Sequence, residues 1–264
     1  MTAELLVAAT AAARAASELL REARPRAIDS KTNPKDLVTE WDLRSEEVIR
    51  AVLEKHTPGV PVLGEEGGLG AGQAPGSAVR WVVDPIDGTV NFAHGLPIWC
   101  VSIACEDAAG SVVGVIAAPI LGWWYEASRG GGARDGHGAP VRVSAIDGIE
   151  RALLATGFPY DRATNPLNNF AEWEHFQRLA GACRRLGSAA LDLCLVACGK
   201  FDGYWERHLK PWDVAAGTLI VTEAGGTVTD LRGAAFEPEA GELVATNGSI
   251  HARLIAELAR VKRA

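Results

Sequence analysis

Apolar residues follow helical spacing at two places near the start of the chain. Between Ala3 and Arg24 they recur at this spacing among alanines, and Pro25 would stop a helix there. A similar pattern predicts a second helix from about Thr39 to Lys55. The polar stretch between the two helices, residues 29–36, predicts a loop.

Short apolar runs, separated by glycine and aspartate, predict strands beyond the second helix. These strands are Val60 to Leu63, Arg80 to Asp84, Trp99 to Glu106, Val112 to Ala118, Trp123 to Ser128 and Val141 to Ser144, with a glycine-rich loop at residues 67–72. Because the runs follow one another with short connections, we expect a meander and therefore a mostly antiparallel sheet.

After about residue 144 the pattern changes to strands that alternate with helices. The predicted strands are Leu153 to Thr156 and Tyr204 to Glu206, and the predicted helices are Asn169 to Ala180, Ser188 to Cys198, one from near Asp213 and one that Ser249 would cap. We therefore predict an α/β (α+β) protein with two lobes. The first spans residues 1–144 and carries the acidic motifs described below, and the second spans residues 145–264 and completes the site.

Composition favours an ordinary globular protein. The chain has 264 residues, of which 48% are hydrophobic and 22% charged, so it can bury a large core. No apolar run approaches the ~20 residues that cross a bilayer, which favours a cytoplasmic protein without a membrane partner. The odd number of cysteines, 5, in apolar surroundings indicates reduced core residues.

Net charge excludes one class of partner and favours another. The chain carries a net charge of −7 with dispersed basic residues, whereas nucleic-acid binding normally needs a basic stripe. We therefore expect no nucleic-acid partner. An acidic protein that handles a phosphate must offset its own charge, and bound divalent cations do so effectively.

The stretch from Asp84 to Thr89, Asp-Pro-Ile-Asp-Gly-Thr, is the most informative one. An apolar strand ends at Asp84, Pro85 interrupts strand pairing, and Gly88 permits a tight turn. The spacing can place the carboxylates of Asp84 and Asp87 on one side, next to a backbone carbonyl, and Mg²⁺ prefers such oxygen ligands. The same sequence also fits a surface turn that binds no metal.

Two other acids stand where an element begins or ends. Glu65 follows a predicted strand, and Asp213 opens a predicted helix of small residues. Each also has a plain structural reading, Glu65 as a solvated loop side chain and Asp213 as a partner of the helix N-terminus. Glu66 is expected to point away from Glu65 and to be structural.

Together these stretches resemble the inositol monophosphatase family, within the wider group of lithium-sensitive, metal-dependent sugar phosphatases. The matching stretches are Lys31 with residues 36–42, Gly64-Glu65-Glu66, residues 84–89, Gly187-Ser188-Ala189, Glu206 and residues 212–217. They occur in the family's order over nearly the whole chain. The resemblance implies a layered α/β/α/β/α sandwich of the inositol monophosphatase/fructose-1,6-bisphosphatase type, usually a homodimer.

The resemblance also implies a metal site of about two to three Mg²⁺ ions. One ion would be held by Glu65, Asp84 and the Ile86 carbonyl, a second by Asp84, Asp87 and Asp213, and a third, weaker one by Glu65 and water. Two such cations stabilise the attacking and the leaving oxygen of a displacement at phosphorus. Glu65, Thr89 and Asp42 are the implied catalytic residues, because Thr89 with Asp42 would position and help to deprotonate the attacking water.

The substrate would be a small phosphorylated alcohol, with myo-inositol monophosphate as the leading choice. The implied substrate contacts are Lys31, Asp87, Gly88, Thr89, Gly187, Ser188, Ala189, Glu206 and Asp213. Among these contacts, the backbone N–H groups of Gly88 and Thr89 suit the phosphate oxygens. Glu206 could instead pair with Arg207 or Lys210 at the surface.

Several other activities are also consistent with the sequence. Relatives that act on nucleotide 3′-phosphates or histidinol phosphate tend to have a lysine after the Gly-Thr pair, where this chain has Val90. That favours the inositol branch but leaves fructose 1,6-bisphosphate open. A non-catalytic regulatory protein on the same fold is less favoured, since clustered acids without cations repel one another.

Asp42 has a second interpretation. Thr39-Glu40-Trp41-Asp42 fits a capping box, in which the two outer side chains satisfy N–H groups at the helix start. The capping role and the catalytic role can coexist.

Overall fold

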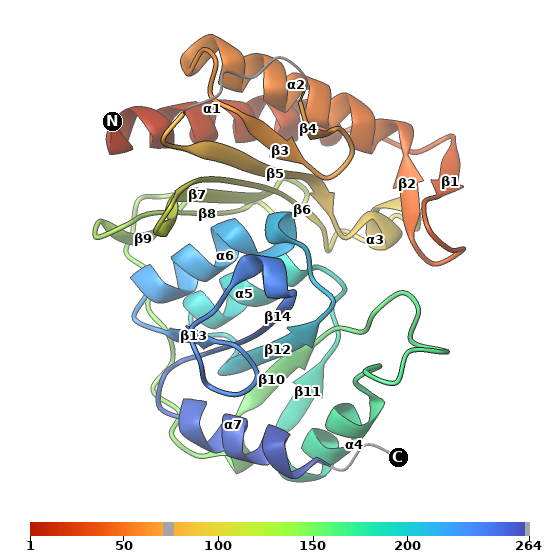
Figure 1. The fold of residues 1–264 in the computed structure, drawn as a ribbon, viewed down its shortest axis with the longest axis vertical. Helices are drawn as coiled ribbons and strands as arrows, with labels where there is room; N and C mark the ends of the chain where they lie inside the picture. Colours follow the sequence, from red (N-terminus) through yellow and green to blue (C-terminus); the bar gives the residue numbers. More distant parts are fainter. Residues whose placement is uncertain (71–76, 262–264) are drawn as a thin grey trace.

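The computed structural model describes residues 1–70 and 77–261 and shows alternating layers of helices and sheets (Figure 1). Helices α1 (Thr2–Leu20) and α2 (Glu40–His56) cover the outer face of the larger sheet. Helices α5 (Ala189–Ala197) and α6 (Pro211–Glu223) lie between the two sheets, and α4 (Phe170–Leu179) and α7 (His251–Arg260) cover the outer face of the smaller one. The predicted α/β/α/β/α layering is confirmed.

The larger sheet has seven strands in the order β4-β3-β5-β6-β7-β8-β9. Their bounds are β3 Val62–Gly64, β4 Gly68–Leu69, β5 Arg80–Asp87, β6 Cys100–Asp107, β7 Gly110–Ala118, β8 Trp123–Ser128 and β9 Gly132–Asp135. Among the described strands of this sheet, only β3 and β5 pair in parallel, so the expectation of a mostly antiparallel sheet is confirmed. Buried alanines on α1 let this helix pack closely on the sheet.

The smaller sheet has five strands in the order β11-β10-β12-β14-β13. Their bounds are β10 Leu153–Thr156, β11 Ala182–Arg184, β12 Gly203–Arg207, β13 Thr227–Thr229 and β14 Glu242–Thr246, and two short 3-10 turns, η1 (Ile149–Arg151) and η2 (Pro238–Ala240), complete this half. Residues of α5 and α6 share one core with both sheets, and the two-lobe division at residue 144 stays a prediction.

Three predicted elements differ from the structure. The strand at residues 141–144 is wrong, because Pro140 has no N–H to donate and the Val143 N–H bonds to Ala224 O at the end of α6 rather than to a strand (3.3 Å). The first helix ends at Leu20 instead of near residue 24. The last helix is capped by Ile250 rather than Ser249, and the Asn247 side chain accepts from the Ile250 N–H (3.2 Å).

The two predicted loops contain strands. Residues 29–36 belong to a hairpin of β1 (Ile28–Ser30) and β2 (Leu37–Thr39), which Asp36 closes by accepting hydrogen bonds from the Lys31 N–H (2.8 Å) and the Thr32 hydroxyl (2.6 Å). The predicted glycine loop at residues 67–72 contains β4, and its last positions lie outside the described residues. All five cysteines are free, as predicted.

Candidate active site

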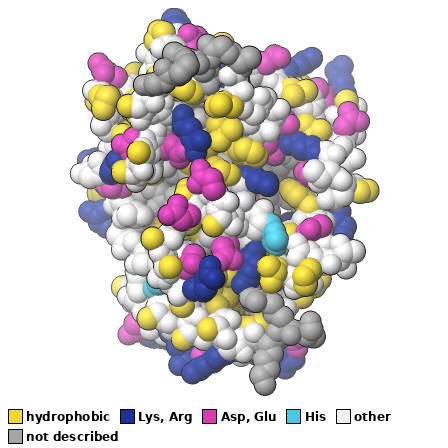
Figure 2. All heavy atoms as spheres, in the orientation of Figure 1, with side chains coloured by type: hydrophobic (Ala, Val, Ile, Leu, Met, Phe, Trp, Pro, Cys, Tyr) yellow, Lys and Arg dark blue, Asp and Glu magenta, His cyan; other side chains and the backbone are white. Residues whose placement is uncertain are grey.

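A pocket of about 460 Å³ lies where the end of β5 meets the first turns of α5 and α6. Almost every predicted site residue lines it: Lys31, Glu65, Asp84, Ile86, Asp87, Gly88, Thr89, Gly187, Ser188, Ala189, Glu206 and Asp213. Acidic and basic side chains gather around the hollow near the middle of the face in Figure 2. Asp42 is the exception, since it lies behind Thr89.

Asp84 and Asp87 are both buried at the end of β5, so the surface-turn alternative is wrong. The pairing of β5 with β6 becomes irregular between them, as Pro85 requires. Asp87 Oδ2 accepts from the Ser188 hydroxyl (2.6 Å) and the Ala190 N–H (2.7 Å), which ties β5 to the start of α5. Gly88 has φ +101°, and a Cβ there would lie 3.0 Å from Ile98 O, so this turn needs glycine.

Burial and mutual repulsion disfavour charge on these acids. Burial, and then the charges of Glu65, Asp87 and Asp213, raise the pKa of Asp84 well above its usual range. Burial also raises the pKa of Asp213, and it raises that of Asp87 to about 6 although hydrogen bonds from Ser188 and α5 oppose it. A bound cation would therefore be needed for all of them to ionise together.

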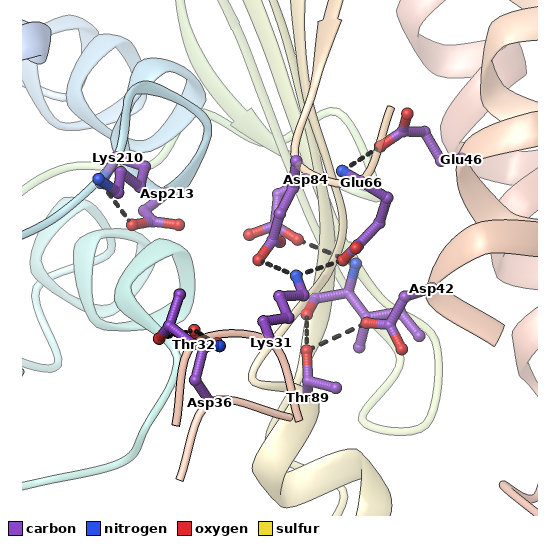
Figure 3. Close-up of polar contacts among 12 residues, drawn as sticks. Lys31, Thr32, Asp36, Asp42, Glu46, Glu66, Asp84, Thr89, Lys210 and Asp213 are labelled. Atoms are coloured by element: carbon purple, nitrogen blue, oxygen red, sulfur yellow. Dashed lines mark hydrogen bonds and ion pairs between the residues drawn. The ribbon is translucent and has the colours of Figure 1, made fainter. Parts of the chain in front are cut away.

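Lys31 brings a positive charge to the edge of this cluster. Its Nζ lies 2.7 Å from Glu65 Oε1 and 2.5 Å from Glu66 Oε1 (Figure 3). Burial alone would lower the pKa of the Lys31 ammonium, but the two carboxylates raise it above its ordinary value. The expectation that Glu66 points away from Glu65 is therefore wrong.

Glu46 on α2 explains the orientation of Glu66. Its carboxylate accepts from the N–H groups of Glu66 (2.8 Å) and Gly67 (2.9 Å) and from Arg50 Nε (2.8 Å). These hydrogen bonds hold the turn at residues 65–67, and Figure 3 shows the one from the Glu66 N–H. Because the strand ends before this turn, strand alternation does not decide where the two glutamates point. Burial, and the neighbouring charge of Glu65, raise the pKa of Glu66 to about 7 although Lys31 opposes this.

Glu46→Gln is expected to lower the free energy of unfolding by about 1–3 kcal/mol. The variant has one acceptor oxygen instead of two, so its NH₂ group would face at least one N–H group that now donates to Glu46. Urea unfolding measures this change. The exposed neighbour Glu47→Gln is the matched control and should stay within about 0.5 kcal/mol of the parent. Equal stability of the two variants would show that these hydrogen bonds are not needed.

Thr89 and Asp42 are joined as the resemblance implied. Thr89 Oγ1 lies 3.1 Å from Asp42 Oδ1 and 3.0 Å from Ile86 O, and both can accept its proton. The other oxygen of Asp42 accepts from the N–H (2.8 Å) and hydroxyl (2.6 Å) of Thr39 in a complete capping box. The two interpretations of Asp42 therefore coexist in one geometry, and burial raises the pKa of this carboxyl.

Glu206 lies at the opposite side of the pocket and is not a surface side chain. It accepts a hydrogen bond from the Tyr204 hydroxyl (2.5 Å), and burial raises its pKa to about 7. Gly157 faces it so closely that a Cβ there would lie 2.0 Å from its carboxylate. The neighbouring Arg207 forms an ion pair with Glu172 (3.1 Å).

Several residues that the sequence analysis did not single out also line the pocket. They include Tyr160, Arg185, Asp192 and Lys210. Asp192 stands one helical turn after Ser188, and this spacing could have indicated it. Tyr160 lies in the connection between β10 and α4, and no local sequence signal marks it.

The donor set fits a hard divalent cation. Carboxylates and a carbonyl converge on one pocket, and their raised pKa values show that negative charge there lacks compensation. Lys31 Nζ forms an ion pair with Glu65, so one positive charge already lies at this edge of the pocket. In the described residues, no three acidic, histidine or cysteine side chains are close enough together to form a finished metal cage.

A pocket lined by several carboxylates can hold the cations that assist phosphoester hydrolysis. The model of the inositol monophosphatase family matches residues 1–263. The chain belongs to this family and is a phosphatase of the inositol monophosphatase type.

The relatives are divided between proteins named inositol-1-monophosphatase and proteins named Nus factor SuhB. The chain is 41% identical to an inositol-1-monophosphatase of Synechocystis sp., covering 88% of this chain and 80% of that protein. It is 42% identical to the Nus factor SuhB of Pseudomonas aeruginosa, covering 92% and 91%. The structure of inositol monophosphatase from Anabaena (Nostoc) superposes with a TM-score of 0.89 at 39% identity and covers 98% of this chain and 96% of that one.

Proposed function

We propose that the protein hydrolyses myo-inositol monophosphate to inositol and phosphate with the help of Mg²⁺. The observation that carries this proposal is the buried set of acids around one pocket, next to the Thr89–Asp42 pair. The similarity to proteins named inositol-1-monophosphatase supports the choice of substrate.

Bound Mg²⁺ would supply positive charge to the phosphate oxygens and ease deprotonation of a water molecule. Glu65, Asp84 and the Ile86 carbonyl would hold one ion, and Asp84, Asp87 and Asp213 a second, with a third weaker position at Glu65. Lithium sensitivity is part of the same proposal, because a small monovalent cation could occupy the second position without supplying the same charge.

Thr89 and Asp42 would orient the attacking water and take its proton. The Thr89 hydroxyl donates its proton to Asp42 Oδ1 or to Ile86 O. The lone pairs of the Thr89 oxygen therefore remain available to accept a hydrogen bond. A water that donates to this hydroxyl would be fixed beside the phosphate. Because burial raises the pKa of Asp42, its carboxylate is a stronger base than a solvated aspartate.

The other pocket residues would bind the phosphate and the alcohol. Gly88 and Thr89 offer backbone N–H groups to phosphate oxygens, and Lys31 neutralises charge at that end. The Gly187-Ser188-Ala189 turn and Glu206 would contact the hydroxyls of the alcohol. A homodimer, which the family resemblance implies, and a cytoplasmic location are further parts of the proposal. No helix within the described residues is long and apolar enough to cross a membrane.

A panel of substrates tests this proposal. Phosphate release is measured from inositol 1-phosphate, fructose 1,6-bisphosphate, histidinol phosphate and a nucleotide 3′-phosphate, each with Mg²⁺ or with chelator. We expect the largest kcat/KM for inositol 1-phosphate. A larger value for another ester would identify a related small phosphatase, and no release from any of them would favour a non-catalytic role on the same fold.

A further inference from the structure

Asp192 differs from the other buried acids around the pocket. It lies on α5, is only 1% exposed and lines the pocket. Its Oδ1 is one of two buried side-chain polar atoms that have no hydrogen-bond partner among the described residues. Asp87 is also buried, whereas Asp213 and Glu206 are partly exposed, and each of these three accepts at least one hydrogen bond.

The surroundings of Asp192 do not compensate for its burial. Burial, and then the charges of Glu206 and Asp87, raise the pKa of Asp192 well above its usual range, and only Arg185 opposes them. A buried polar group without a partner costs free energy in the folded state. An unpaired buried group of this kind needs an explanation, and a functional role is one of the recognised explanations.

We propose that Asp192 is a specificity-determining residue that accepts a hydrogen bond from a hydroxyl of the substrate's alcohol. This inference rests on the proposed function and narrows it. Asp192 and Glu206 both line the pocket, and the carboxyl group of each can accept a hydrogen bond from a hydroxyl. The preferred substrate is therefore the phosphate ester of a polyhydroxylated alcohol. An aryl phosphate without hydroxyls would form no hydrogen bonds with Asp192 and Glu206.

Two variants and two substrates test the role of Asp192. Asp192→Ala removes the acceptor, and Asp192→Asn keeps one oxygen of nearly the same shape. Their kcat and KM are measured at saturating Mg²⁺ with inositol 1-phosphate and with phenyl phosphate, which has a ring but no hydroxyl. The melting temperature of each variant is measured without substrate.

We expect Asp192→Ala to lower kcat/KM for inositol 1-phosphate about tenfold, mainly through KM, since a substrate hydroxyl that is left without its partner in a buried site commonly costs this factor. Phenyl phosphate should be cleaved as by the parent, and Asp192→Asn should recover part of the loss. Because the unpaired group is gone, Asp192→Ala should melt no lower than the parent.

Asp202→Ala is the matched control. Asp202 is 6% exposed and outside the pocket, and it accepts from the Leu153 N–H (2.6 Å) and the Ser144 hydroxyl. Its loss should lower the melting temperature and leave the ratio of kcat/KM for the two substrates unchanged.

Three outcomes would overturn the inference. If Asp192→Ala has a lower melting temperature than the parent and the same ratio of kcat/KM for the two substrates, Asp192 is a structural residue or is paired with a buried water. If both substrates lose activity equally, it acts at the phosphate end. In either case the proposed phosphatase activity itself stands, whereas a parent protein that cleaves neither ester would refute the proposed function and this inference with it.

Discussion

Asp84→Asn is expected to lower phosphate release at least ~10³-fold, because several kcal/mol of charge stabilisation depend on the cations that this carboxylate would share. Asp84 lines the same pocket as Glu65, Asp87 and Asp213 and would be a ligand of both ions, so its loss should weaken Mg²⁺ binding at both proposed positions. Calorimetric titration with Mg²⁺ measures the binding, and phosphate release measures the rate. In chelator, the variant should be at least as stable as the parent, since repulsion within the cluster is reduced.

Asp107→Asn is the control for this result. Asp107 lies at the end of β6, outside the pocket, and forms an ion pair with Arg129 (2.9 Å). Its replacement should leave both Mg²⁺ binding and phosphate release unchanged, with a stability cost below about 1 kcal/mol. Mg²⁺ binding by Asp84→Asn that is indistinguishable from the parent would refute the proposed ligand set.

Asp42→Asn should reduce turnover ~10²-fold or more, the usual range for a lost acid–base partner. The amide keeps an oxygen that can accept from Thr39 at the helix start, so the variant should fold nearly normally. It loses the negative charge that would take a proton through Thr89. Turnover at saturating Mg²⁺ and urea unfolding separate the two effects.

Thr39→Ala gives the opposite pattern and serves as the comparison. It removes the cap from α2, which should cost about 0.5–2 kcal/mol of stability. Most of the turnover of the folded protein should remain, because Asp42 still faces Thr89. If Asp42→Asn retains near-normal turnover, the capping role suffices and the catalytic role is wrong.

The chemistry of the pocket was visible in the sequence wherever it depends on neighbouring residues. Asp84 and Asp87 are three positions apart at a strand end, so their common side follows from local geometry. The contact between Asp42 and Thr89 joins residues 47 positions apart, and the family resemblance rather than the local pattern indicated it. Local signals do not determine which distant side chains meet.

The errors have the same origin. Glu66 is expected to point away from Glu65, but Glu46, 20 positions earlier, accepts from the Glu66 N–H, and the Glu66 side chain contacts Lys31 together with Glu65. The predicted strand at residues 141–144 does not form because its N–H groups bond to different elements: that of Val141 bonds to Ala133 O of β9, and that of Val143 to Ala224 O at the end of α6. In the sequence, Asp192 is one polar residue in an apolar helix, and only the fold shows that it lines the same pocket as Glu206.

The central claim is that bound Mg²⁺ and a water molecule act on the phosphorus of a phosphorylated alcohol in this pocket. It is tested most directly by titrating chelator-treated protein with Mg²⁺ in ¹⁸O-water, with inositol 1-phosphate as substrate. We expect no release without Mg²⁺, recovery as Mg²⁺ is restored, and ¹⁸O in the released phosphate. Release that is independent of Mg²⁺, or ¹⁸O found in the inositol, would contradict it.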